Sequence, residues 1–321
     1  MPENSWCDKN TKKELSPPFV VEKDKDYYQS LEEKLILLKN NIKSLNIDEE
    51  NETNILSTID SVIEVFSNYY SGDMKNAISI MEEIIKGLTG TFIVTNLSDA
   101  MGRFYDSSHS LGNMYLFRAR NSNEMRDFSC DDMKHIPFFM RERVPNCRFS
   151  MNGIPCLYLG NTSYDCWLEL GRPAEHKFHV CTMKLKKDKK ILNLTISNGD
   201  IFSKDIKSPD FVNYVKILIL KICTSYTVEQ EGRSFKSEYI FPQLMTIVCD
   251  KLMDGIVYFS KRVSDERFAI PAINIVLFSK YKNGDCEYGE VCKDLIIGNS
   301  INYSYFKQTY DSFLNKGSYG V

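Results

Sequence analysis

The sequence predicts an α+β fold with a small helical bundle near its N-terminus and an irregular series of strands and helices after it. Between residues 26 and 87, apolar residues recur every three or four positions, which is typical of amphipathic helices. After about residue 112 the pattern changes to period two, which is typical of strands with one buried face. Strands and helices then alternate without a βαβ repeat, which favours α+β over a doubly wound sheet.

Three parts of the chain are expected from these patterns. Residues 1–25 are polar and contain Pro17-Pro18, so we expect a disordered lead-in. Residues 26–110 form a helical N-terminal domain in which no residue pattern points to chemistry. Residues 111–321 form a second domain that holds the strands. The helical runs of the N-terminal domain are Tyr27–Leu45, Ile55–Phe66 and Met74–Lys86, the last of which ends before Gly87.

The second domain is expected to contain mixed or antiparallel sheets with flanking helices. Strands are predicted at Met114–Arg120, Ile154–Leu159, Phe178–Leu185, Ile256–Phe259 and Ala272–Ser279. Helices are predicted at 163–170, 209–226 and 238–253. The basic run Lys184–Lys190 is expected to form a solvated hairpin end.

Composition narrows the class of protein. A chain of 321 residues that is 43% hydrophobic is long enough for two domains with ordinary cores. The net charge of −3 gives no general attraction to nucleic acid. No apolar run reaches the roughly 18 residues that span a membrane, and the polar start is not a secretory signal. The ten cysteines include no CxxC pair, which favours reduced thiols in the cytoplasm over a disulfide framework.

Three side chains between residues 148 and 173 form the most informative group. Arg148 precedes an Asn-Gly turn, Tyr158 lies in the next strand, and Glu169 lies in the last turn of the following helix. Each has an ordinary explanation: a surface arginine, a half-buried strand tyrosine and a structural ion pair. However, a carboxylate at a helix C-terminus opposes the helix dipole. Glu169 is therefore the strongest candidate for a functional residue.

Two further segments add candidates. Arg118 and Arg120 share one face of a predicted strand, where they could bind a phosphate or simply be solvated. Ser260 ends the segment DGIVYFS, and a serine is common at a strand end. His176 and His179 lie on opposite faces of an extended segment, so we expect no metal site. Phosphate-binding loops and hydrolase motifs such as GxxxxGK[ST] and GxSxG are absent.

Five segments together resemble the RES domain family, which is named for its arginine, glutamate and serine. Over about half the chain the matching order is YLFRAR, RFSMNGIPCLYL, WLELG, DGIVYFS and NIVLF. Two positions depart from the family pattern, because Cys147 replaces a glycine and Ser150 an asparagine. Both changes concern the turn around Arg148.

The resemblance implies a fold similar to ADP-ribosyltransferases and an enzyme that consumes NAD. By position, Arg118 and Arg148 would be the anion-binding arginines, with Arg120 beside them. Tyr158 would lie against the nicotinamide, and Glu169, Ser260 and the anion-binding Arg148 would be the catalytic residues. NAD would be the substrate, with no metal required. The acceptor stays open: water or phosphate in an NAD glycohydrolase or phosphorylase, or a protein side chain in an ADP-ribosyltransferase.

A different class of function is an inactive nucleotide-binding or interaction protein that has the same fold. Family members often act as toxins of bacterial toxin–antitoxin pairs or as defence proteins. The resemblance therefore also implies a cognate antitoxin or regulatory partner, which would bind the apolar faces of the N-terminal helices. The same faces could serve homo-oligomerisation. Neither nucleic acid nor a membrane is an expected partner.

Overall fold

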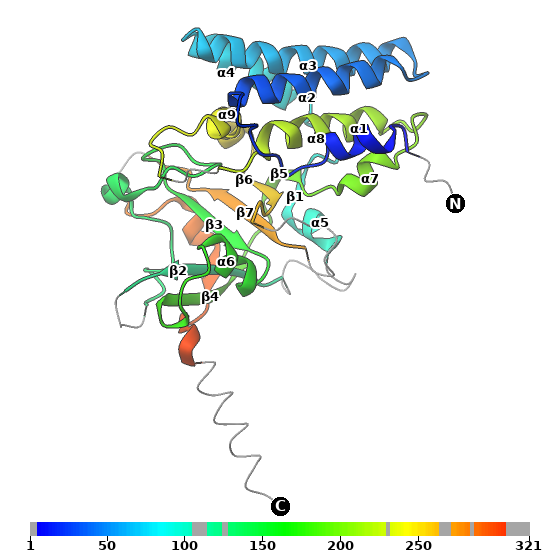
Figure 1. Ribbon diagram of the computed structural model, residues 1–321. Coiled ribbons are helices and arrows are strands. Elements are labelled where there is room, and N and C mark those ends of the chain that lie inside the picture. The colour runs from blue at the N-terminus through cyan, green and yellow to red at the C-terminus, as the bar shows by residue number, and fades with distance from the viewer. Residues whose placement is uncertain are drawn as a thin grey trace, which may run out of the picture. The chain divides into compact units, whose positions relative to one another are not determined.

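A computed structural model of the chain describes residues 5–104, 114–123, 128–228, 232–262, 271–282 and 286–305 (Figure 1). The chain divides into two compact units, each assembled from segments that are distant in sequence. The first unit comprises Met1–Thr95, Pro145–Asn152 and Lys190–Ile256, and the second comprises Asn96–Val144, Gly153–Lys189 and Val257–Val321. The domain boundary expected near residue 110 stays a prediction. In the structure, residues 190–256 belong to the same unit as the N-terminal helices.

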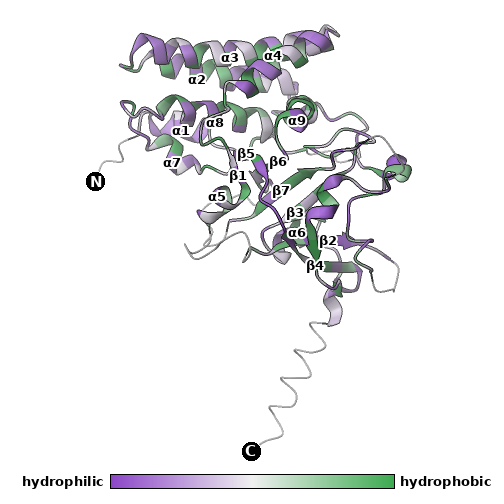
Figure 2. Ribbon diagram, turned by 180° about the vertical axis from the view of Figure 1, so that it is seen from behind, coloured by the Kyte–Doolittle hydropathy of each residue, from purple (hydrophilic) through white to green (hydrophobic). Residues whose placement is uncertain are grey.

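The first unit is mainly helical. Its elements are α1 (Lys9–Glu14), α2 (Tyr27–Lys43), α3 (Glu49–Tyr70), α4 (Met74–Lys86), β1 (Val94–Asn96, at its border), β5 (Lys190–Leu194), α7 (Asn198–Phe202), α8 (Phe211–Thr224), the 3₁₀ turn η4 (Ser237–Tyr239) and α9 (Ile240–Leu252). The helices α2, α3 and α4 lie side by side (Figure 1). Figure 2 shows hydrophilic and hydrophobic residues alternating along these three helices, as the periodicity predicts.

An aspartate starts each of these three helices. The side chains of Asp26, Asp48 and Asp73 accept hydrogen bonds from backbone N–H groups of the first turn. The apolar faces then pack on α8 and α9. Phe66 stacks on Phe241 with ring centroids 5.7 Å apart, so the bundle shares its core with residues 190–256.

The expected disordered lead-in is wrong for the described residues 5–25. They contain α1, and Trp6 is only 8% exposed. The indole Nε1 of Trp6 donates a hydrogen bond of 2.8 Å to the carbonyl of Ile201, and Phe19 packs against Tyr226. A few apolar side chains thus anchor a segment whose average composition is polar.

The second unit carries most of the strands. Its elements are α5 (Leu97–Gly102), β2 (Leu116–Asn121), η2 (Phe138–Arg143), β3 (Cys156–Gly160), α6 (Ser163–Glu169), η3 (Glu175–Lys177), β4 (Phe178–Leu185), β6 (Gly255–Phe259, at its border), β7 (Ile273–Phe278), η5 (Glu290–Asp294), β8 (Leu295–Ile297) and β9 (Ile301–Asn302). The strand order here is β6-β7-β3-β2-β4-β8, with β9 also paired to β4. Helices flank the strands in both units, which confirms the α+β class.

Antiparallel pairing sets the register of this sheet. Strand β3 pairs with β7 so that Gly160 faces Asn274, and β2 pairs with β3 at Phe117 and Gly160. The predicted hairpin at Lys184–Lys190 is wrong, because β4 pairs with β2, β8 and β9 and not with β5. Lys189 instead forms a salt bridge of 2.5 Å with Asp294, which draws the basic run onto the end of η5.

Among the helices of the described residues, none combines enough length with enough apolar character to cross a membrane.

Candidate functional site

The segment from β3 to α6 builds the site, and its sequence explains its shape. Thr162 caps α6, since its hydroxyl accepts the N–H of Asp165 at 3.0 Å. Gly171 adopts φ +78° just after the helix, which suits glycine in the C′ position. Asn161 fixes this turn to β7, because its side chain accepts from the N–H of Ile273 and donates to the carbonyl of Pro271.

The structure brings Glu169 and Ser260 together, and adds Asn274. The Ser260 hydroxyl donates to Oε1 of Glu169 at 2.5 Å, and Nδ2 of Asn274 donates to the same oxygen at 2.6 Å. Ser260 and Asn274 are 5% and 6% exposed, whereas Glu169 is half-buried at the end of α6. Three separate segments therefore meet at one carboxylate.

The hydrogen bonds of this cluster leave one carboxylate oxygen available. The Ser260 hydroxyl also accepts the N–H of Arg262 at 3.1 Å, which orients its proton towards Glu169. Among the described residues, no donor reaches Oε2 of Glu169. A fixed carboxylate with one unbonded oxygen can accept a hydrogen bond from a ligand hydroxyl or stabilise a nearby positive charge.

Sheet register shows which predicted residues share a face with this cluster. Phe117 and Ala119 of β2 pack against the α6 residues Cys166 and Trp167, so α6 covers that face of the sheet. Phe117, Gly160 and Asn274 are aligned across three strands, which places Asn274 on the same face.

Tyr158 also belongs to this face. It lies two residues before Gly160 in β3 and pairs with Val276 of β7. Because side chains alternate along a strand, its half-buried ring is on the side of Asn274.

Arg118 and Arg120 lie on the opposite face of β2, since they alternate with Phe117 and Ala119. Both guanidinium groups donate to the carbonyl of Lys134, at 3.2 and 2.8 Å. Arg118 also donates to the backbone carbonyl of Tyr158 at 2.9 Å. Burial, and then the neighbouring charge of Arg120, lower the pKa of Arg118 to about 10.

Arg148 belongs to the first unit, where it holds a chain turn. Its two terminal nitrogens donate to the carbonyls of Thr224 and Tyr226 at 2.8 and 2.7 Å. Its guanidinium carbon lies 5.0 Å from the centre of the Tyr239 ring. These contacts give Arg148 a structural role, and its predicted role towards NAD stays a prediction.

Two residues of the site were not among the candidates from the sequence. Asn274 is a polar residue inside a strand that is otherwise apolar and fully buried, which is the signal that could have revealed it. Asp165 lies in the first turn of α6, just after the helix cap, where an acidic residue is common and draws no attention in the sequence. However, it is only 4% exposed, and a buried carboxylate needs a further explanation.

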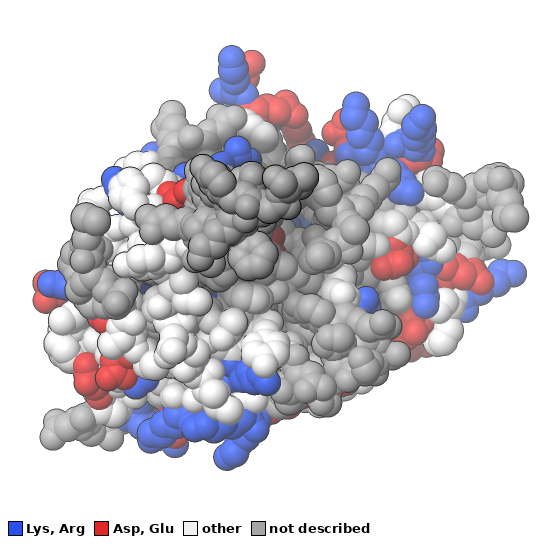
Figure 3. All heavy atoms as spheres, turned by 90° about the horizontal axis from the view of Figure 1, so that it is seen from below, with Lys and Arg blue, Asp and Glu red and all other residues white. Residues whose placement is uncertain are grey.

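No group of three or more histidine, cysteine, aspartate or glutamate side chains that could hold a metal ion occurs among the described residues. On the face shown in Figure 3, basic and acidic side chains are interspersed over the described surface. Neither sign of charge covers that part of the surface alone.

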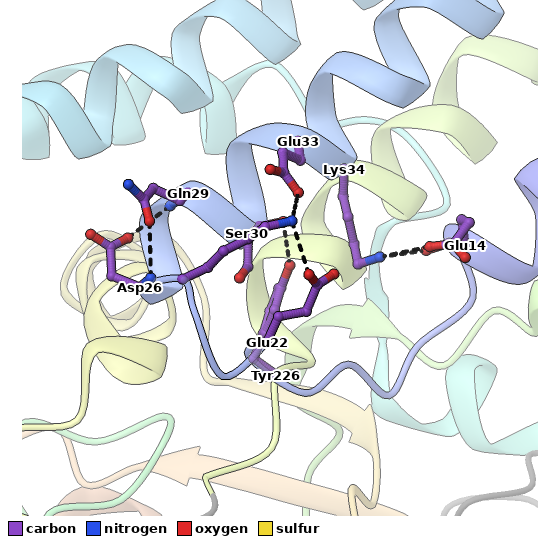
Figure 4. A network of polar contacts seen from close by, with 9 residues as sticks. Glu14, Glu22, Asp26, Gln29, Ser30, Glu33, Lys34 and Tyr226 are labelled. Atoms are coloured by element: carbon purple, nitrogen blue, oxygen red, sulfur yellow. Dashed lines mark hydrogen bonds and ion pairs between the residues drawn. The ribbon is translucent and has the colours of Figure 1, made fainter.

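A separate hollow of ≈ 330 Å³ lies in the first unit, and four of the charged groups that line it, Glu14, Glu22, Glu33 and Lys34, are already in ion pairs. Lys25 reaches Glu22 and Glu33 at 2.9 and 2.5 Å, and Lys34 reaches Glu14 at 3.4 Å. Figure 4 shows how Lys34 and Glu14 point towards each other in this network. None of the predicted site residues lines this hollow.

The fold and the half-buried carboxylate of Glu169 define an α+β protein with a candidate functional site on one face of its sheet. Part of the chain is similar to a Bacillus subtilis protein named "Putative toxin YopC", with 38% identity over 141 residues. That match covers 40% of this chain and 31% of the relative, so the chain spans about a third of that relative's length. No family model matches the chain, and no solved structure matches it.

Proposed function

We propose that this protein is an enzyme that cleaves the bond between nicotinamide and ribose in NAD. The observation that supports the proposal is the carboxylate of Glu169, which Ser260 and Asn274 hold through Oε1, while Oε2 has no donor within the part of the chain that the structure describes. The resemblance to RES domains connects this arrangement to NAD, since it assigns catalytic roles to Glu169 and Ser260. No metal ion is required in this proposal.

The chemistry follows from where charge develops. The C1′–N bond breaks, its electron pair leaves with nicotinamide as a neutral heterocycle, and positive charge builds on the ribose, as in glycoside cleavage. A fixed carboxylate beside the ribose stabilises that charge and binds its hydroxyls. The acceptor then forms a bond to C1′ and loses its proton to solvent. Water or phosphate would make the protein a glycohydrolase or phosphorylase, and a protein side chain an ADP-ribosyltransferase.

The remaining site roles rest on the resemblance. We propose that the ring of Tyr158 lies against the nicotinamide, which agrees with its place on the face of Asn274. Arg118, Arg120 and Arg148 are the residues proposed for the NAD phosphates. All three guanidinium groups donate to backbone carbonyls here, so phosphate binding would require them to share or exchange these partners.

The biological role proposed is that of a toxin acting on cytoplasmic NAD. The partial similarity to a protein named as a toxin supports it, as does the resemblance to a family with many toxins. A toxin of this kind would require a cognate antitoxin or other regulatory partner. The apolar faces of α2 to α4 are already buried within the first unit, so the proposed binding surface for the partner is the exposed, polar face of these helices.

Nicotinamide release from NAD by the purified protein tests the proposed reaction. Glu169→Gln removes the charge with little change in shape, and we expect it to lower the rate at least about a hundredfold. The matched control is Glu142→Gln, which changes an exposed glutamate of the second unit and should leave the rate unchanged. Full activity of Glu169→Gln would exclude the assigned role.

A wild-type protein that releases no nicotinamide, with water, phosphate or cell extract as the source of acceptor, would exclude the proposed reaction. Calorimetric binding of NAD or ADP-ribose under those conditions would then assign the chain to the class of inactive nucleotide-binding proteins.

A further inference from the structure

A second carboxyl group lies one helical turn before Glu169. Asp165 and Glu169 are four residues apart on α6, and residues with this spacing share one side of a helix. Asp165 is 4% exposed, and its Oδ2 atom is buried without a hydrogen-bond partner among the described residues. An unpartnered buried carboxylate oxygen is costly unless it carries a proton.

The two carboxyl groups have opposite environments. Glu169 is half-buried and receives two hydrogen bonds at Oε1, from Ser260 and Asn274. Asp165 is more deeply buried and lacks a donor at Oδ2, and burial favours the protonated form. Neighbouring carboxyl groups with such different surroundings divide the acid and ionised roles between them.

We propose that Asp165 and Glu169 form a coupled carboxyl pair, in which Asp165 holds a proton in mildly acidic solution and releases it as the pH approaches neutrality. Asp165 is then a positioning residue, which acts on the reaction through the charge of Glu169. This inference rests on the proposed cleavage of NAD for its effect on rate. The sharing of the proton itself depends only on the geometry of α6.

The groups around Asp165 support its role as the residue of the pair that carries the proton. The titratable groups beside it on α6 are Cys166 and Glu169, whereas β2 presents the uncharged Phe117 and Ala119 to this helix. Burial raises the pKa of Asp165 to about 6, and although a hydrogen bond with Thr162 lowers it, the charge of Glu169 raises it further. The proton is therefore lost near neutral pH.

Ionisation of Asp165 would place a second negative charge one helical turn before Glu169 on α6. That charge favours the positive ribose of the transition state, so wild-type turnover should rise with pH through an inflection near pH 6. Asp165→Asn keeps the shape of the protonated acid and cannot ionise. We expect the variant to lack the inflection and to release nicotinamide about tenfold more slowly than wild type at pH 8, because it lacks the second negative charge.

The test measures nicotinamide release between pH 5 and 8 for wild type, Asp165→Asn and Asp200→Asn. Asp200 has the same place after a helix cap, in α7, but is exposed, so its variant should follow the wild-type profile. If Asp165 has a purely structural role, Asp165→Asn should lower the rate by the same factor at every pH. An unchanged inflection in Asp165→Asn would overturn the proposal.

A second measurement separates this inference from the proposed reaction. Because folding raises the pKa of Asp165, the wild type should lose stability as pH rises from 4 through 6, and Asp165→Asn should not. The urea concentration at half-unfolding should therefore be higher for the variant than for wild type, and this difference should grow between pH 4 and pH 7. A difference that is constant with pH would exclude the shared proton, whether or not NAD is cleaved. A pH-dependent difference without nicotinamide release would keep the carboxyl pair and reject the NAD reaction.

Discussion

The hydrogen bond between Asn274 and Glu169 allows a quantitative test of the site. Asn274→Ala removes the amide that donates to Oε1 at 2.6 Å and leaves Ser260 as the second donor. Glu169→Ala removes the acceptor. A double-mutant cycle of the two changes isolates their interaction from the other effects of each substitution.

The expected magnitude follows from the charge and burial of the two groups. A hydrogen bond to a charged group contributes about 1.5–3 kcal/mol to stability. Asn274 is 6% exposed but Glu169 is half-buried, so solvent screens part of the interaction. We expect a coupling of about 1.5 kcal/mol in the free energy of unfolding. If the same contact holds the carboxylate in the transition state, Asn274→Ala should lower nicotinamide release roughly tenfold.

The assay is urea unfolding of the wild type, the two single variants and the double variant, followed by circular dichroism. Asn193→Ala provides the matched control, because Asn193 is also a buried asparagine in a strand but bonds Thr195. Its effect should add to that of Glu169→Ala without coupling. A coupling below about 0.5 kcal/mol between Asn274 and Glu169 would refute the contact as the anchor of the carboxylate.

Two further substitutions test which contacts stabilise the fold around the site. Arg148→Ala should lower the free energy of unfolding by about 3 kcal/mol, because it removes two charged hydrogen bonds to Thr224 and Tyr226; a loss of activity with unchanged urea stability would instead indicate a role towards the substrate alone. Gly160→Ala should cost about 1–3 kcal/mol, because a Cβ there would lie 2.9 Å from Sγ of Cys166. Adding Cys166→Ala should restore part of that urea stability, and no recovery would contradict the predicted clash.

Local signals in the sequence predicted the elements best where the cap residues were unambiguous. Helix α6, which Thr162 and Gly171 delimit, matches the predicted range 163–170 to within one residue, and α4 spans Met74–Lys86 as its periodicity predicts. The strands β1, β8 and β9 are only two or three residues long, too short to give a period-two pattern. The ordered N-terminal segment was missed because Trp6 is buried by contacts with residues almost two hundred positions away.

The candidate site was predictable only in part, because strand register is not visible in the sequence. The order of the family motifs predicted Glu169 and Ser260, and the structure joins them through one hydrogen bond. Alternation alone correctly placed Arg118 and Arg120 on one face of β2, but it could not show that α6 covers the other face. Asn274 stands out in the sequence as a polar residue in an apolar strand, but its place beside Glu169 follows only from the pairing of β7 with β3.

The position of Glu169 at the end of α6 can now be explained in energetic terms. A negative charge in the last turn of a helix costs about 0.3–1 kcal/mol. Each hydrogen bond from Ser260 and Asn274 contributes about 1.5–3 kcal/mol, so the two donors more than offset that cost. Neither donor comes from α6 itself, so the carboxylate is held in place by Ser260, which follows β6, and by Asn274 of β7. Its position is therefore set by residues outside the helix, although it lies at a helix end, where fraying is common.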